Sequence, residues 1–210
     1  KRASGDPYFA HPIEVAGILT DYRLDTETIV TALLHDVIED TDVSRADVER
    51  LFGAEIAELV EGVTKLSKLE LSQEHLRQAE NLRKFILAIS KDVRVLLVKL
   101  CDRLDNMRSL EFMKPEAQER IARETMEIYA PLANRLGIAR FKSELEDLSF
   151  RYVEPQAYAD LEKQIQTTSA QRDKYIAEVN KILAGKLAEQ GFAADVTGRA
   201  KHLYSIWRKM

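Results

Sequence analysis

The sequence predicts a mainly helical protein that ends with the beginning of an α/β segment. The 210 residues include only 8 glycines and 5 prolines, and aromatic residues make up 7%, a combination that favours helix over sheet. Apolar residues recur at helical spacing along most of the chain. Only residues 191–197, which follow a helix-ending glycine position, alternate as in a strand.

Composition and charge narrow the classes of function. Hydrophobic residues are 45% and charged residues 31% of the chain, which is typical of a globular protein with a substantial core. The net charge of -4 provides no global basic field, so we expect no direct binding of nucleic acid. No run is long and apolar enough for a transmembrane helix or a signal peptide, so we expect no membrane contact.

The single cysteine indicates the compartment. Cys101 excludes an internal disulfide and points to a reducing, cytoplasmic location. It lies in an apolar run, so we expect a buried and inert thiol. The chain starts at Lys1 without a methionine and stops at Met210, and we expect it to be a piece of a longer protein.

Helix-capping residues, prolines and glycines indicate where the expected helices begin and end. Residues 2–7 have the composition of a loop, and Pro12 fits the first turn of a helix. Asp25 and Ser44 are expected to cap the second and third helices, and Pro131 and Gly137 to limit later ones. Helices are expected over 12–19, 25–40, 44–51, 55–65, 81–89, 91–110, 116–129, 141–151 and 155–187.

The stretch 30–41 contains a dense cluster of ionisable side chains. Four ionisable side chains fall within two turns of an apolar helical run: His35, Asp36, Glu39 and Asp40. Residues three and four apart share a face, so all four can line one strip of a continuous helix. Buried charges are normally paired, hydrogen-bonded or bound to metal, and a divalent cation is the most economical explanation. A solvated helix end is the alternative, and this stretch alone leaves both readings open.

A second stripe lies on the helix expected over 91–110. Its first half is apolar nearly all round, so the helix should be buried. Polar residues then follow at i, i+3, i+4 and i+7: Asp102, Asp105, Asn106 and Ser109. We expect the stripe to face the His35–Asp36 strip, with Asp102 completing a metal site. The alternative is that the helix reaches the surface here and the stripe is wet.

The motifs together resemble one family. The matching segments are 2–8, 11–12, 35–41, 63–66, 98–104, 106–108, 129–137 and 198–206, which extend over essentially the whole chain. Their joint pattern resembles the Rel/Spo-type bifunctional guanosine tetraphosphate synthetase/hydrolases. The resemblance implies an all-α HD-superfamily metal phosphohydrolase domain over 1–152 and a helical linker over 153–190. Residues 191–210 would be a truncated entry to an α/β, nucleotidyltransferase-like synthetase domain.

The resemblance also implies a reaction and a set of residues. The reaction is removal of pyrophosphate from the ribose 3′ position of (p)ppGpp, giving GDP or GTP. The implied Mn²⁺ ligands are His11, His35, Asp36 and Asp102. The pair acting on the attacking water is Glu39 and Asp40. The residues that hold the guanine nucleotide are Arg2, Ser4, Asn106 and Ser109. The synthetase nucleotide contacts are Arg199, Lys201, His202 and Ser205.

Some positions depart from the resemblance. Many relatives carry His where this chain has Asp105, and the extra negative charge could tighten a metal or repel the substrate. Ala3 replaces a basic residue of some relatives, and Ser109 replaces a frequent Thr but keeps the hydroxyl. His11 alone, at a helix start, would be read as structural or solvated, and only the resemblance makes it a ligand.

Two alternatives to the hydrolase remain. One is an HD phosphohydrolase that acts on another nucleotide. The 2–7 loop and the second stripe argue against this alternative. The other is a silent regulatory domain that has kept the fold and lost the chemistry. All the implied metal ligands and the acidic pair are present, which favours activity. Because the synthetase part is incomplete, we expect no synthetase activity from this chain. Regulatory partners are expected to bind through later domains that the chain lacks.

Overall fold

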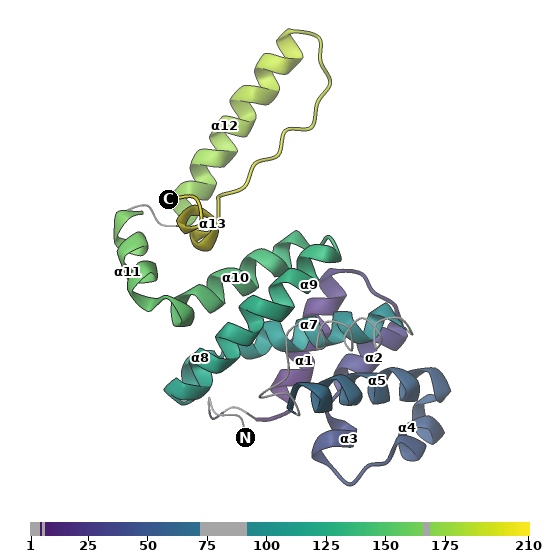
Figure 1. Ribbon diagram of the computed structural model, residues 1–210. Helices are drawn as coiled ribbons and strands as arrows, with labels where there is room; N and C mark the ends of the chain where they lie inside the picture. Colours follow the sequence, from purple (N-terminus) through teal and green to yellow (C-terminus); the bar gives the residue numbers. More distant parts are fainter. Residues whose placement is uncertain (1–4, 6, 72–91, 166–168) are drawn as a thin grey trace.

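The computed structural model describes residues 5, 7–71, 92–165 and 169–210 (Figure 1). These residues are helical with irregular connections, which confirms the all-α fold. None of the helices within the described ranges is long and apolar enough to cross a membrane. The expected helix over 81–89 lies outside the described residues, as do Arg2 and Ser4. The described α-helices are α1 (Ala10–Asp21), α2 (Thr26–Leu34), α3 (Val37–Asp40), α4 (Arg45–Phe52), α5 (Ala54–Leu71), α7 (Val93–Arg108), α8 (Pro115–Glu124), α9 (Ala130–Arg135), α10 (Ala139–Val153), α11 (Pro155–Gln164), α12 (Ser169–Glu189) and α13 (Leu203–Trp207).

The expected caps are present at the early helices. Asp25 accepts a hydrogen bond from the Thr28 backbone N–H at 2.9 Å and so caps α2. Ser44 and Asp47 form a reciprocal capping box at the start of α4. Gly53 ends α4 with φ at 92°, a conformation that glycine adopts without a steric penalty. Local chemistry therefore sets these boundaries.

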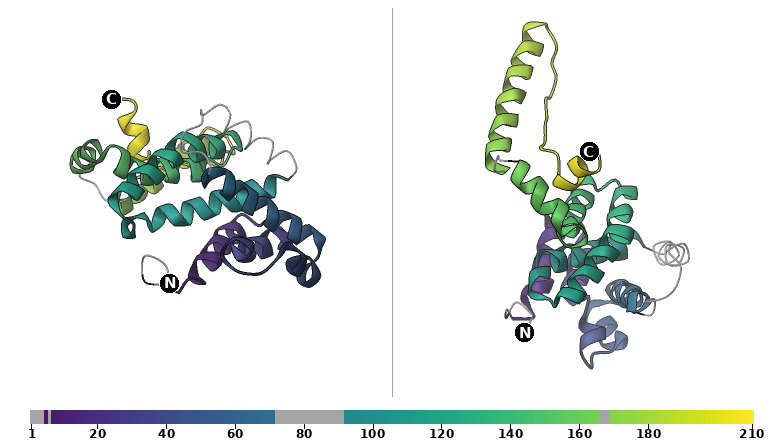
Figure 2. Two further views of the ribbon diagram at one scale, coloured as in Figure 1. Left: turned by 60° about the horizontal axis from the view of Figure 1, so that its bottom comes forward. Right: turned by 60° about the vertical axis from the view of Figure 1, so that its left-hand side comes forward.

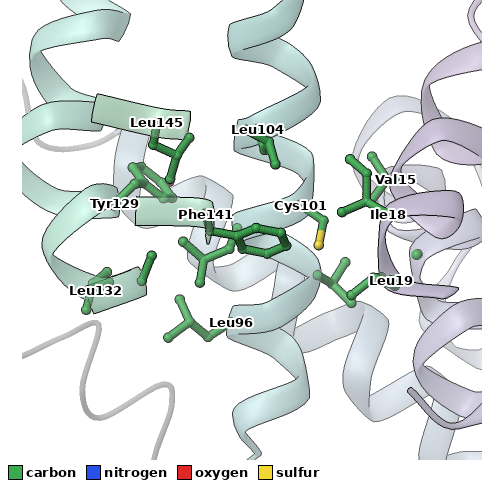
Figure 3. Close-up of a cluster of buried hydrophobic side chains, with 14 of the residues drawn as sticks. Val15, Ile18, Leu19, Leu96, Cys101, Leu104, Tyr129, Leu132, Phe141 and Leu145 are labelled. Carbon is green, nitrogen blue, oxygen red and sulfur yellow. The ribbon is translucent and has the colours of Figure 1, made fainter. Parts of the chain in front are cut away.

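Helix α7 is the centre of the fold. It is buried over almost its whole length, and α1, α2, α5 and α10 pack around it (Figures 1 and 2). In Figure 3, the α7 side chains lie between those of α1 and those of the later helices. Cys101 is among them, and burial raises the pKa of its thiol, as expected of an inert cysteine. The polar residues of α7 are thus held on a rigid, buried element.

The contact between α5 and α7 is tight at Gly62. A Cβ atom placed there would lie 2.8 Å from Val95 Cγ2. We expect Gly62→Ala to lower the free energy of unfolding by about 1–3 kcal/mol, because the stiff β-branched Val95 cannot move aside. The matched variant Gly17→Ala, with open space around it on α1, should instead stabilise by roughly 0.5–1 kcal/mol. Urea unfolding of both variants is the measurement, and stabilisation by both would contradict the close contact.

One expected helix limit is wrong. The helical backbone continues from α8 through a π-helical segment, Thr125–Tyr129, into α9, so Pro131 does not end a helix. Proline lacks an N–H and its ring crowds the carbonyl four residues earlier. Prolines and π segments are both sites at which helices depart from regular geometry, and here the two are adjacent. Gly137, with φ at 75°, follows α9 as expected.

The long helix expected over 155–187 is two helices. α11 ends at Gln164, the following Ile165 has ψ at 77°, and α12 begins at Ser169. The apolar side chains of the two parts face different surroundings: Leu161 is buried, whereas Tyr175 and Ile182 are exposed. Figure 1 shows α12 projecting from the helical body. The helical spacing of the apolar residues correctly predicted helix in both halves. It did not show that the two halves would lack a common core.

The strand expected over 191–197 is also wrong. The described residues contain no strand, and this segment is extended and runs back beside α12 (Figures 1 and 2). Gly198 lies against α12, where an added Cβ would be 2.9 Å from Asn180 Oδ1. A strand requires a neighbouring strand for its backbone hydrogen bonds, and the described part of the chain supplies none. The expected α/β segment is therefore not found there.

Candidate metal centre

The helix expected over 25–40 is interrupted at its most polar point. α2 ends at Leu34, His35 and Asp36 form a turn, and α3 restarts the helix. The expectation of one strip on one helix is therefore wrong, and the acidic pair Glu39 and Asp40 is exposed. Adjacent residues of a regular helix point about 100° apart, so the turn allows His35 and Asp36 to face the same site.

His35 has a free coordinating atom. The side chain is 1% exposed, and its Nδ1 donates to the carbonyl oxygen of Ala32 at 2.7 Å. Its Nε2 lies 3.2 Å from Asp36 Oδ1 but without hydrogen-bond geometry, and it has no hydrogen-bond partner among the described residues. Leaving a buried polar atom unsatisfied is costly. The arrangement therefore suits His35 Nε2 to bind a cation.

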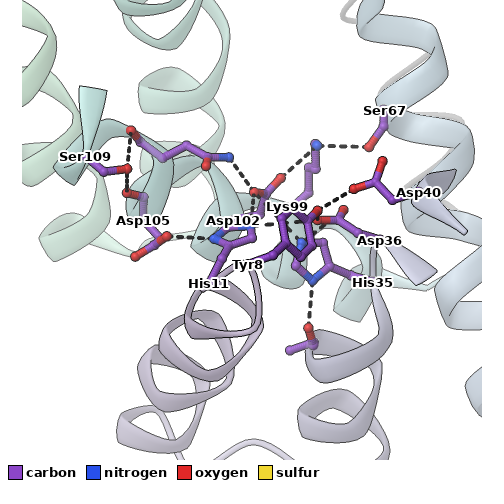
Figure 4. A network of polar contacts seen from close by, with 12 residues as sticks. Tyr8, His11, His35, Asp36, Asp40, Ser67, Lys99, Asp102, Asp105 and Ser109 are labelled. Atoms are coloured by element: carbon purple, nitrogen blue, oxygen red, sulfur yellow. Dashed lines mark hydrogen bonds and ion pairs between the residues drawn. The ribbon is translucent and has the colours of Figure 1, made fainter. Parts of the chain in front are cut away.

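Three segments converge on this atom (Figure 4). His11, at the start of α1, places its Nε2 3.2 Å from Asp102 Oδ1 and 4.0 Å from Asp36 Oδ2. Asp102 Oδ1 is in turn 4.0 Å from His35 Nε2. Ligand atoms of His11, His35 and Asp36 all lie within 4.8 Å of one another. The geometry therefore brings together two imidazoles and two carboxylates that could hold a metal ion.

A buried lysine holds the far side of Asp102, and the sequence reading missed it. Lys99 Nζ donates to Asp102 Oδ2 at 2.8 Å and to Ser67 Oγ at 3.0 Å. Burial works to raise the pKa of the Asp102 carboxyl, but Lys99 and His11 hold it well below its usual range. The detectable signal was a lysine three residues before Asp102 inside an apolar run. Asp102 is therefore ionised, with one oxygen turned to the histidines.

Tyr8 is a second residue that the sequence reading missed. Its hydroxyl donates to Asp36 Oδ2 at 2.7 Å and also contacts the Asp40 carboxylate. Burial and these two carboxylates raise the pKa of Tyr8, so the phenol stays protonated. The available signals were its place in the matching segment 2–8 and its position three residues before His11. Tyr8 joins the cluster to one member of the exposed acidic pair.

The polar stripe of α7 faces inward, so the wet-surface alternative is wrong. Asp102 and Asp105 are 5% and 7% exposed, and Asn106 and Ser109 are half-buried. Asn106 Nδ2 donates to Asp102 Oδ1 at 2.6 Å. The Ser109 hydroxyl bonds to backbone carbonyls of its own helix, those of Asp105 and Asn106. Asn106 thus touches the cluster directly, and Ser109 lies one turn further along.

The residues expected to contact a nucleotide in the synthetase part lie elsewhere. Arg199, Lys201 and His202 line a separate cavity of about 540 Å³, with Arg140 and Arg172. Ser205 lies on α13, whose first backbone N–H groups, at Leu203 and Tyr204, donate to the Asp147 carboxylate of α10 at 3.3 and 3.0 Å. The lining also includes Asp147 and Asp173, but basic side chains outnumber acidic ones, and its residues are distinct from those around His35.

Metal binding at this centre should release a proton. Burial lowers the pKa of His11, but Asp102 and Asp105 raise it from 6.5 to about 9. In the metal-free protein, the proton on His11 stabilises the fold fully below pH 6.5 and this stabilisation is lost as the pH rises through about 9. Against the effect of burial, the carboxylates of Asp36 and Asp102 also raise the pKa of His35, and a metal requires both imidazoles neutral, so we expect at least about one proton released per ion near pH 7.5. Calorimetry in buffers of different ionisation enthalpy is the measurement. An affinity independent of pH between 6.5 and 9 would contradict this.

The sequence of the chain is similar to those of known proteins. The HD domain model matches residues 1–139, and the chain therefore belongs to the HD domain family. The GTP pyrophosphokinase of Myxococcus xanthus is 54% identical over 213 residues, covering 100% of this chain and 28% of that protein. The probable guanosine-3′,5′-bis(diphosphate) 3′-pyrophosphohydrolase of Synechocystis is 52% identical over 211 residues, with the same coverage. The chain thus spans less than a third of these relatives.

A solved structure extends the likeness to the fold. The metazoan ortholog of SpoT, described as hydrolysing ppGpp, is 34% identical with a TM-score of 0.50. The match covers 70% of this chain and 82% of that one. Together with the curated relatives, it confirms the resemblance to Rel/Spo-type enzymes.

Proposed function

We propose that this chain is the hydrolase part of a bifunctional stringent-response enzyme and removes the 3′-pyrophosphate of (p)ppGpp, giving GDP or GTP. The observation that carries the proposal is the buried Nε2 of His35, which has no hydrogen-bond partner in the described residues and faces two carboxylates. The names of the relatives supply the substrate class. The proposed metal ligands are His11, His35, Asp36 and Asp102.

The donor set supports a transition metal. Two imidazoles and two carboxylates suit Mn²⁺, Fe²⁺ or Zn²⁺ better than Ca²⁺, and Mn²⁺ is the ion that we propose. When bound, such an ion lowers the pKa of water and offsets phosphate charge. The chain has a net charge of -4, so a pyrophosphate needs local positive charge to approach it.

We assign the exposed acidic pair a role on the attacking water. Glu39 and Asp40 are both exposed, and Tyr8 connects Asp40 to Asp36 through its hydroxyl. We assign them the orientation of the attacking water and the acceptance of its proton. The water oxygen bonds to the phosphorus attached to the ribose 3′ oxygen, the bond between that phosphorus and the 3′ oxygen breaks, and the 3′ oxygen stays on the GDP or GTP and takes up a proton. Pyrophosphate is the other product.

Other residues are assigned to the nucleotide and to the rest of the protein. Arg2, Ser4, Asn106 and Ser109 would hold the guanine nucleotide, of which Asn106 is already beside Asp102. The hydrolase domain would occupy 1–152, the linker 153–190 and the entry to the synthetase 191–210. Arg199, Lys201, His202 and Ser205 would contact a nucleotide only in the complete synthetase domain. We propose a cytoplasmic location, with regulators binding to later domains of the longer protein.

The test is pyrophosphate release from ppGpp by this chain, first with Mn²⁺ and then with a chelator. We expect release that depends on the metal and is much faster than from other nucleotides at the same concentration. Release from another nucleotide in preference to ppGpp would support an HD phosphohydrolase of different specificity. Metal binding without release from any nucleotide would support a silent regulatory domain.

A further inference from the structure

The carboxylate of Asp105 contacts a proposed metal ligand from outside the centre. Its Oδ2 lies 2.6 Å from His11 Nδ1, and the two residues are 7% and 4% exposed. His11 is at the start of α1 and Asp105 is on α7, one turn beyond Asp102. The contact therefore joins two helices that both contribute to the centre, as Figure 4 shows.

The contact determines which nitrogen of His11 is available. An ionised carboxylate only accepts hydrogen bonds, so Nδ1 must carry its hydrogen and donate to Asp105. Nε2 is then the atom turned toward Asp102, at 3.2 Å, and toward Asp36, at 4.0 Å. The second imidazole is held in the same way, because His35 Nδ1 donates to the Ala32 carbonyl. Both rings thus have Nδ1 anchored and Nε2 directed inward.

We propose that Asp105 is a positioning residue, which fixes the tautomer and ring orientation of His11 and thereby strengthens metal binding. This rests on the proposed function only in that it requires the metal centre. Of the two effects expected for the extra charge, tightening of the metal is the one this geometry favours, because the carboxylate engages the outer nitrogen of the ligand. Carboxylates behind metal-binding histidines orient the ring and raise its basicity, and removing them typically costs 10–100-fold in affinity.

Three variants of the whole chain test this, with Co²⁺ as the probe. Asp105→Leu and Asp105→Ala both remove the acceptor, whereas Asp105→Asn keeps an oxygen that can accept from Nδ1. Asp160→Asn, at an exposed position of α11, is the control for loss of a carboxylate. The readouts are Co²⁺ affinity, by competition with a chromophoric chelator, and the visible absorption spectrum of the bound ion. Urea unfolding establishes which variants are folded.

We expect Asp105→Leu and Asp105→Ala to weaken Co²⁺ binding on the order of 10–100-fold and to shift the absorption bands. Asp105→Asn should recover most of the affinity and the wild-type spectrum, which a purely structural role would not require. Wild-type affinity and spectrum in either folded Leu or Ala variant would overturn the proposal. So would failure of the wild-type protein to bind Co²⁺, since the centre itself would then be absent. The expected losses without any pyrophosphate release from ppGpp would support the positioning role and refute only the proposed reaction.

Discussion

Replacing His35 with alanine is expected to abolish both divalent-metal binding and metal-dependent pyrophosphate release from ppGpp. His35 is the most buried member of the cluster, and its Nε2 faces Asp36 and Asp102 while Nδ1 is committed to Ala32. A bound metal contributes several kcal/mol of charge stabilisation to such reactions, and each 1.36 kcal/mol is a factor of ten in rate. We therefore expect a loss of roughly 1000-fold or more, measured at an Mn²⁺ concentration that saturates the wild-type protein.

The matched control is His202→Ala. It removes an imidazole of the same chain from the separate basic cavity, where His202 pairs with Asp147 at 3.4 Å. That variant should keep metal binding and pyrophosphate release within about twofold of wild type, since surface changes away from a site usually have small effects. Equal pyrophosphate release by His35→Ala and His202→Ala would show that the metal centre is not the site of the reaction. Loss of activity with unchanged metal affinity would place the ion elsewhere.

Much of the centre could be predicted because its residues cluster in the sequence. His35 and Asp36 are adjacent, and Asp102 directly follows an apolar run, so periodicity alone placed it deep. His11 could not be found this way, because a single histidine at a helix start has no neighbours that mark it. Its place in the site depends on how α1 packs against α7, which is a tertiary property.

The errors have a common physical origin. The break at His35–Asp36, the π-helical segment before Pro131 and the division between α11 and α12 all interrupt stretches whose periodicity was correctly identified. Periodicity reports that apolar residues share a face, but a helix is held mainly by packing of that face. Where neighbouring parts pack on different surfaces, or adjacent polar residues must face one site, the backbone departs from a regular helix. The strand at 191–197 failed for the complementary reason that a strand is stable only beside another.

Lys99→Met is expected to destabilise the metal-free protein far more than the metal-bound protein. Lys99 and Asp102 are both buried and paired at 2.8 Å, so removing the ammonium takes one of its positive partners from a buried carboxylate and leaves it the histidines of the centre. Breaking a buried pair in this way typically costs about 3–5 kcal/mol. A divalent cation beside Asp102 would supply the missing positive charge. Adding Mn²⁺ should therefore restore much of the lost stability, which thermal unfolding with and without metal measures.

The control for Lys99→Met is Lys65→Met on α5, where the lysine is exposed and pairs with Glu61 at 3.0 Å. Exposed pairs contribute about 0–1 kcal/mol, so Lys65→Met should unfold near wild type, and the metal should stabilise Lys65→Met and the wild-type protein equally.

An ion at 100 times its dissociation constant stabilises a protein by about 2.7 kcal/mol. Because Lys99 is close to the proposed ligands, its loss also removes a repulsion for the cation, and the metal-induced rise in melting temperature should be larger in Lys99→Met than in wild type. An equal or smaller rise would mean that Asp102 does not face the ion, and that Lys99 serves the fold alone.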